Sequence, residues 1–206
     1  LLNAGADKVS INTAAVENPE LLSQAAKVFG SQCIVSSIAA FRKEKGRYQV
    51  WVDYGREMTS LDAIEWARKV EDLGVGEILL TTINNEGMGQ GYDLDLINTI
   101  ASRATIPVIA CGGAGSKQDF SYAVLKAGAD AVSASSVFHY HYARPKENKN
   151  TMQFSENRLR MGAQIDSGNI DFLNEGYGGE QAIMVTPCSL NNVKTHMRDE
   201  GISVRL

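Results

Sequence analysis

Short apolar segments alternate with longer amphipathic segments along residues 1–140, and most of the amphipathic segments end at a glycine. The short segments are rich in β-branched residues and show no clean alternation of polar and apolar side chains. This composition is typical of strands buried on both faces of a parallel sheet. The repeated order of strand, helix and glycine therefore predicts an α/β fold made of βα units. The expected strands cover residues 8–12, 33–38, 77–82, 107–111 and 131–135.

Several expected helices show their boundaries in the sequence. Asn18, Pro19 and Glu20 combine a capping residue, a first-turn proline and an early acid, and they predict a helix that continues to residue 29. Residues 60–73 carry apolar side chains at helical spacing, with Trp66 on their core face. Two more helices are expected at residues 94–101 and 117–126.

Two segments depart from this rhythm. Residues 41–54 alternate like a strand after a turn at Lys45 and Gly46, which predicts a β-hairpin inserted after the second strand. Residues 141–189 are polar with weak periodicity, and we interpret them as an insertion or long loop before the last helix, which Ser189 would cap. We expect residues 1–206 to form a single domain.

The sequence that begins at Gly5 is partly repeated at Gly128. Residues 5–13 read Gly-Ala-Asp-Lys-Val-Ser-Ile-Asn-Thr, and residues 128–136 read Gly-Ala-Asp-Ala-Val-Ser-Ala-Ser-Ser. Their separation is about half of the ~250 residues of a typical (β/α)8 barrel. Such a repeat is expected of a barrel built from two related halves. The chain is therefore predicted to form a partial (β/α)8 (TIM) barrel.

Small and hydroxyl residues follow three of the expected strands. Such strand ends leave backbone N–H groups open, and the next helix adds the positive end of its dipole, which together suit a phosphate. Alternatively, the glycines only permit tight strand-to-helix turns. Two sites on opposite sides of the barrel would suit a substrate with a phosphate at each end. The residues are Asn12 and Thr13, Gly112 and Gly113, and Ser135 and Ser136.

These motifs, in this order, resemble the HisF family, the cyclase subunits of imidazole glycerol phosphate synthase within the wider HisA/HisF family. The resemblance covers about residues 1–142 and the last helix. It implies that the chain holds approximately strands four to eight of the barrel, truncated at its N-terminal side. The segments that carry it are residues 5–15, 29–32, 62–67, 76–81, 91–93, 107–115 and 136–140.

The resemblance also implies an activity in histidine biosynthesis. HisF cyclases convert the ribonucleotide PRFAR and ammonia to imidazole glycerol phosphate and AICAR, without a cofactor. The ammonia comes through the barrel from a glutaminase partner, a HisH-like subunit. Because strands one to three would be missing, we expect the 206 residues alone to be catalytically inactive.

Residue by residue, the resemblance implies two phosphate sites and an ammonia gate. Asn12 and Thr13 correspond to ligands of one substrate phosphate. Asp7, Lys8 and Glu77, at the amino ends of strands, correspond to the glutaminase interface and the gate; alternatively, they are only solvated strand-end charges. The residues implied for the other phosphate are Glu86, Gly87, Gly112, Gly113, Ser135 and Ser136.

The match fails where the family carries its second catalytic acid. Ala39 stands at the position of that aspartate, so no catalytic residue of the family is intact here, because a methyl group cannot transfer a proton. Asn84 and Met88 also replace a carboxylate and a hydroxyl of the family pattern. Two hypotheses follow: a cyclase subunit, or a HisF-like subunit that binds a glutaminase and channels ammonia without cyclase activity, for example in surface-polysaccharide amidation.

Net charge and composition argue against several classes of binding partner. The net charge of −4 argues against a nucleic-acid partner, and no apolar run is long enough to span a bilayer. Three scattered cysteines favour neither disulfides nor a zinc cluster, so a reduced cytoplasmic location is expected. His139 and His141 lack a third ligand at a suitable spacing, and we therefore expect no metal site.

Overall fold

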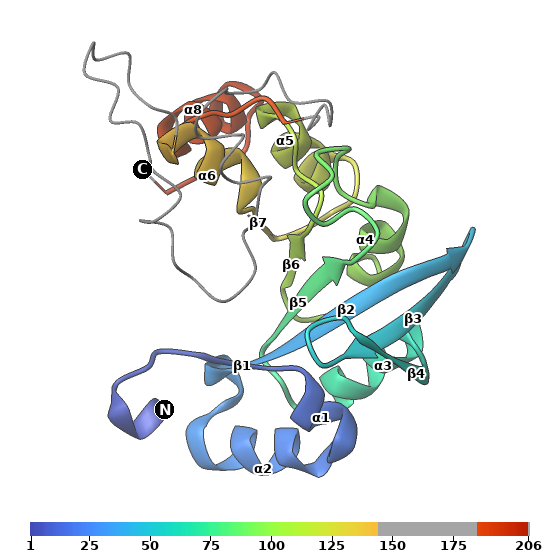
Figure 1. Ribbon diagram of the computed structural model, residues 1–206. Helices are drawn as coiled ribbons and strands as arrows, with labels where there is room; N and C mark the ends of the chain where they lie inside the picture. The colour runs from blue at the N-terminus through green and yellow to red at the C-terminus, as the bar shows by residue number, and fades with distance from the viewer. Residues whose placement is uncertain (144–184, 206) are drawn as a thin grey trace, which may run out of the picture.

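Five parallel strands form the centre of the protein. The computed structural model describes residues 1–143 and 185–205. Within these residues the parallel strands are neighbours in the order β1, β2, β5, β6, β7, so spatial order follows sequence order as in a (β/α)8 barrel (Figure 1). All five predicted strands are confirmed, and so is the partial barrel. Their bounds are Val9–Ile11 (β1), Ile34–Glu44 (β2), Glu77–Thr82 (β5), Val108–Cys111 (β6) and Ala131–Ser133 (β7).

A β-hairpin extends from the second strand, as the sequence predicts. Strand β2 continues to Glu44, and β3 (Arg47–Val52) pairs with it in antiparallel fashion. A further strand, β4 (Glu57–Asp62), pairs with β3 and was not predicted. The helix expected from residue 60 therefore begins three residues later, where the Asp62 side chain accepts hydrogen bonds from the N–H groups of Ile64 and Glu65.

Helices follow each parallel strand. The prediction that Asn18 caps the second helix is wrong, because a short helix (α1) ends just before Asn18 and the longer helix (α2) starts from Pro19 without a side-chain cap. The C-terminal helix (α8) follows Ser189, whose Oγ accepts from the Asn192 N–H as predicted. The bounds are Leu2–Ala4 and Ser31–Cys33 for the two 3₁₀ turns, and Thr13–Glu17 (α1), Glu20–Phe29 (α2), Ala63–Asp72 (α3), Leu94–Ala101 (α4), Lys117–Leu125 (α5), Ser136–Ala143 (α6) and Leu190–Asp199 (α8).

Only one face of the sheet is fully buried. Ile38, Leu80 and Val108 on that face are within 1% of complete burial and pack in the hydrophobic core with the helices. Leu79 and Ile109 on the opposite face are only half-buried. Because alternate residues of a strand point to opposite faces, the helices cover the outer face and the inner face is the barrel interior.

The predicted insertion at residues 141–189 lies mostly outside the described residues, since residues 144–184 are not described. Its first three residues, 141–143, are helical and complete α6. At the other end the Thr186 N–H donates to the Gly115 carbonyl (2.6 Å), and α8 lies beside α5 (Figure 1). Among residues 1–143 and 185–205, no helix is long and apolar enough to cross a bilayer.

The buried face predicts a strong asymmetry between core and surface substitutions. Ile38→Ala removes a completely buried side chain and should lower the free energy of unfolding by about 2–5 kcal/mol. Val28→Ala alters a side chain that is 72% exposed on α2 and should change it by no more than about 0.5 kcal/mol. Urea denaturation of both variants measures the difference; equal effects would contradict the assignment of the core.

Candidate functional site

The carboxyl ends of the parallel strands meet at one edge of the sheet, which we call the carboxyl edge. Near this edge Ala39 of β2 is in register with Thr81, Thr81 with Cys111, and Cys111 with Ser133, one residue from each of four adjacent strands. Ala39, Thr81 and Cys111 are half-buried on the inner face. The structure therefore places the Ala39 methyl group at the position from which a longer side chain would project into the barrel.

Asn12 and Thr13 follow β1 at this edge, where the sequence predicts a phosphate site. The Asn12 side-chain amide donates to the Ser37 carbonyl (2.8 Å). The Thr13 hydroxyl donates to Asn12 Oδ1 (3.3 Å) and accepts from the Asp53 N–H (3.0 Å). Asp53 lies in the turn between β3 and β4, where it and Tyr54 both adopt positive φ angles of 48° and 57°. No pattern in the sequence predicts that this turn lies beside Thr13.

Gly112 and Gly113 follow β6 and both adopt positive φ angles, 88° and 108°. A Cβ on Gly113 would clash with the carbonyl oxygen of Gly91, and the Gly113 carbonyl itself accepts from the Gly91 N–H at 2.8 Å. The two glycines thus permit a close contact between the end of β6 and the loop after β5.

The loop at residues 83–92, between β5 and α4, carries Glu86 and Gly87. Both are exposed, and nothing lies within 4 Å of the position that a Gly87 Cβ would take. The loop is closed on itself by Asn85, whose side-chain amide donates to the Gly91 carbonyl (2.8 Å). This arrangement presents Glu86 and Gly87 at the tip of a closed loop, in contact through Gly91 with Gly113.

Ser135 and Ser136 follow β7 and begin α6. The Ser135 carbonyl accepts from the N–H groups of Phe138 and His139 (3.1 and 2.8 Å), so Ser135 opens the first turn of the helix. The neighbouring Ser133 carbonyl accepts from the Tyr92 hydroxyl (2.9 Å). Burial raises the pKa of the Tyr92 phenol above its usual range. The ends of β5, β6 and β7 are therefore linked at the carboxyl edge.

Lys8 and Glu77 lie at the opposite, amino edge of the sheet. The Lys8 ammonium and the Glu77 carboxylate form an ion pair between the starts of β1 and β5, which flank β2. The Glu77 side chain is 20% exposed and that of Lys8 is 48% exposed. Asp7 is exposed. The structure therefore brings together two of the three predicted interface residues, on the edge away from the predicted phosphate ligands.

An ionic cluster centred on Arg42 was not predicted. Arg42 Nη2 donates to the Tyr48 hydroxyl (2.8 Å), to Asp93 Oδ1 (3.0 Å) and to Asp95 Oδ2 (3.3 Å). The hydrogen bond to Tyr48 and the neighbouring carboxylates raise the pKa of the Arg42 guanidinium. Burial raises the pKa of the Tyr48 phenol. The one sequence signal was Asp93 directly before the expected helix at residues 94–101, the position of a capping acid.

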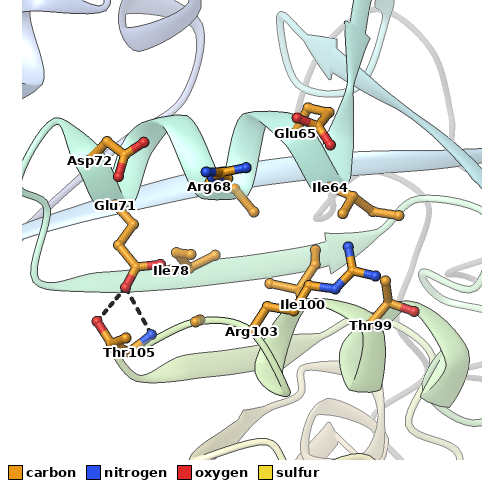
Figure 2. Close-up of a pocket in the computed structure, with 12 residues that line it drawn as sticks. Ile64, Glu65, Arg68, Glu71, Asp72, Ile78, Thr99, Ile100, Arg103 and Thr105 are labelled. Atoms are coloured by element: carbon orange, nitrogen blue, oxygen red, sulfur yellow. Dashed lines mark hydrogen bonds between the residues drawn. The ribbon is translucent and has the colours of Figure 1, made fainter.

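A pocket of about 380 Å³ lies between α3 and α4, on the helix-covered side of the sheet. Figure 2 shows Arg68 and Glu71 of α3 on one side of the pocket and Ile100 and Arg103 on the other, with Ile78 between them. Glu71 accepts from the N–H (2.8 Å) and the hydroxyl of Thr105. Because Ile78 points to the helix-covered face and stands near the start of β5, this pocket is a gap in the helical layer, separate from the residues at the carboxyl edge.

His139 and His141 each pack edge-on against the tyrosine that follows them, with ring centroids 5.4 and 4.9 Å apart. In the part of the chain that the structure describes, no three or more His, Cys, Asp or Glu residues are grouped so as to hold a metal ion.

Sequential parallel strands, an outer layer of helices and small residues at the carboxyl edge together define a barrel of the (β/α)8 class. Comparison with known proteins agrees: the model of the histidine biosynthesis protein family matches residues 1–144. The chain belongs to the histidine biosynthesis protein family.

Within this family the chain is similar to HisF subunits of imidazole glycerol phosphate synthase. It is 43% identical to that of Leptospira biflexa over 162 residues (78% of this chain, 64% of the relative). The identity is 47% for Alkaliphilus metalliredigens over 161 residues (77% and 64%). For Dehalococcoides mccartyi it is 54% over 140 residues (68% and 55%). The chain thus spans less than two thirds of the length of these curated relatives.

The contact between Gly113 and Gly91 predicts that the two glycine positions at the carboxyl edge differ in tolerance. Gly87→Ala meets open space and should cost about 1–2 kcal/mol from its positive φ alone. Gly113→Ala should cost about 1–3 kcal/mol more, because the new methyl group must displace the Gly91 backbone. Thermal unfolding of both variants checks the difference, and equal losses would contradict the close contact.

Proposed function

We propose that the protein containing these residues is the cyclase subunit of imidazole glycerol phosphate synthase, and that it converts PRFAR and ammonia to imidazole glycerol phosphate and AICAR. The observation that carries the proposal is the similarity to HisF subunits, at 43–54% identity. The family match over residues 1–144 agrees with it. Because PRFAR carries a phosphate at each end, the proposal requires two phosphate sites at one edge of the barrel.

The two sites proposed are on different parts of the carboxyl edge. Asn12 and Thr13 would bind one phosphate after β1. Backbone N–H groups and hydroxyls after β5, β6 and β7 would bind the other, with glycines allowing close approach of the phosphate to the main chain. The hydrogen bonds that join these three loops support their acting as one site. The residues of this second site are Glu86, Gly87, Gly112, Gly113, Ser135 and Ser136.

Ammonia would enter from the amino edge. We propose that Asp7, Lys8 and Glu77 face a HisH-like glutaminase subunit in a cytoplasmic complex. The Lys8–Glu77 ion pair supports this proposal, because it is partly exposed and flanks β2 at the end of the barrel opposite Ala39. Ammonia passing along the barrel interior would reach the carboxyl edge without crossing bulk water.

Ala39 is the reason to test a second candidate, a HisF-like subunit that delivers ammonia to another enzyme. A carboxylate at this position could take or give a proton, and general acid–base catalysis of that kind contributes about 10²–10⁴-fold in rate. Ala39 lies on the inner face in register with Thr81, and neither side chain replaces that function at neutral pH. The channelling role would need the amino edge and the barrel interior but no acid at Ala39.

An assay of the full-length protein with glutaminase subunit, glutamine and PRFAR distinguishes the two candidates. The cyclase proposal expects AICAR formation, and it expects Ala39→Asp to increase turnover by about 10²–10⁴-fold through restored proton transfer. Absence of AICAR from both the parent protein and the variant would contradict the cyclase proposal and favour the channelling role. Glutamate release in the same reactions controls for a working glutaminase.

The gate proposal predicts that Lys8→Met weakens coupling between the two subunits. Glutaminase binding, measured by isothermal titration calorimetry on the full-length protein, should weaken by about tenfold, equivalent to about 1.4 kcal/mol. Lys45→Met, at the exposed hairpin turn, removes the same charge far from the amino edge and serves as the control. Equal affinities for the two variants would mean that Lys8 is only a solvated charge at the start of a strand and has no role in glutaminase binding.

A further inference from the structure

We propose that Arg42 is a positioning residue for the phosphate site, because it holds both ends of the loop at residues 83–92 that carries Glu86 and Gly87. The effect of Arg42 on ligand binding rests on the proposed function, whereas its contacts with the loop are independent of that function. We call the set of contacts from Arg42 to Asn84 and Asp93 the Arg42 clamp. Arg42 belongs to the extension of β2 into the hairpin, beyond the last residue paired with β5.

The first half of the clamp uses the Arg42 backbone. Regular pairing of β2 with β5 ends at Ala40 and Thr82, and the Ile83 N–H still donates to the Ala40 carbonyl (2.9 Å). The Arg42 N–H then donates to Asn84 Oδ1 (2.6 Å), and Asn84 Nδ2 donates back to the Arg42 carbonyl (3.3 Å). The Asn84 side chain thus acts as one additional peptide group of the sheet.

This two-way contact gives a physical reason for asparagine at position 84. An amide offers both a donor and an acceptor, whereas an ionised carboxylate offers only acceptors. An aspartate could still accept from the Arg42 N–H, but it would place a second oxygen against the Arg42 carbonyl oxygen. Asn84 therefore fixes the start of the loop in a way that the acid of the family pattern cannot reproduce.

The second half of the clamp uses the Arg42 side chain. Its guanidinium donates to Asp93 Oδ1 (3.0 Å), and the Asp93 side chain is only 3% exposed. The same oxygen accepts from the Leu96 N–H (3.1 Å) at the start of α4 and from the Tyr48 hydroxyl (3.2 Å). Because a buried carboxylate requires compensation of its charge, Arg42 determines where α4 begins and so where the loop ends.

Between these two points the loop has little freedom. The Asn85 side-chain amide donates to the Gly91 carbonyl (2.8 Å), which closes the loop. The Gly91 N–H donates to the carbonyl of Gly113, which follows the next strand (2.8 Å). Glu86 and Gly87 remain at the exposed tip. Fixing both ends of the loop therefore fixes the distance from the Gly87 backbone to Gly113, which is the separation that a phosphate bridging the two loops would require. The hairpin, through Arg42, would therefore help to hold this loop at the carboxyl edge.

Hydrogen exchange of the full-length protein tests the clamp itself. Arg42→Ala should accelerate exchange of amides 84–92 by about tenfold or more, equivalent to about 1.4 kcal/mol of local stability. Arg47→Ala is the matched control, since Arg47 lies on the same hairpin and forms an ion pair with exposed Glu44 (3.1 Å). If the two variants exchange alike, the Arg42 side chain does not hold the loop. Asn84→Asp removes the donor to the Arg42 carbonyl and leaves the buried Asp93 paired, so it tests the backbone half of the clamp by the same measurement and serves if Arg42→Ala fails to fold.

Titration with inorganic phosphate tests the consequence for binding, with the amide resonances of Gly87 and Gly113 as reporters. Arg42→Ala and Asn84→Asp should each lower the affinity for phosphate, as reported by these amides, by about tenfold. Arg47→Ala should bind phosphate with the affinity of the parent protein. Unchanged affinity in both clamp variants would overturn the positioning role. If the parent protein shows no phosphate shift, the proposed phosphate site fails and the positioning role with it, whereas the exchange result still decides whether Arg42 holds the loop.

Discussion

Parallel pairing of β1, β2, β5, β6 and β7 decides which residues of the protein can meet. Because the strands run in one direction, every strand-to-helix turn lies at the same edge and every helix-to-strand turn at the other. Residues separated by more than 100 positions, such as Asn12 and Ser135, therefore share the carboxyl edge. The same constraint places Lys8 beside Glu77 at the amino edge. The two edges can then serve different partners.

The burial of one sheet face makes this arrangement stable. Side chains such as Ile38 and Leu80 are completely covered by helices, whereas the inner-face residues Leu79 and Thr81 are half-buried. The hydrophobic free energy gained on the outer face holds the backbone in place. Small residues such as Ala39 and Cys111 can then occupy the inner face near the carboxyl edge at little cost in core packing, and this freedom allows chemistry there to change without loss of the fold.

The hairpin and the loop after β5 form the least barrel-like part of the protein. Arg42 links them through a main-chain contact to Asn84 and a charged contact to buried Asp93. In a parallel barrel neighbouring loops are free to diverge, because they lie outside the hydrogen-bonded strands. A charged residue on an extended strand that reaches a neighbouring loop removes that freedom. We regard this as the physical link between the unusual hairpin and the predicted phosphate site.

The amino-acid sequence alone was enough to predict the five parallel strands, the β-hairpin, most of the helices and the family. Apolar runs, capping residues and glycines encode local structure directly, and Ser189 and residues 94–101 were placed correctly for that reason. It also showed that Ala39 lacks a carboxylate. The strand β4, the turn beside Thr13, the Lys8–Glu77 pair and the Arg42 clamp were decided only by the tertiary structure. Each depends on contacts between residues distant in sequence, and local propensity carries no information about which distant groups meet.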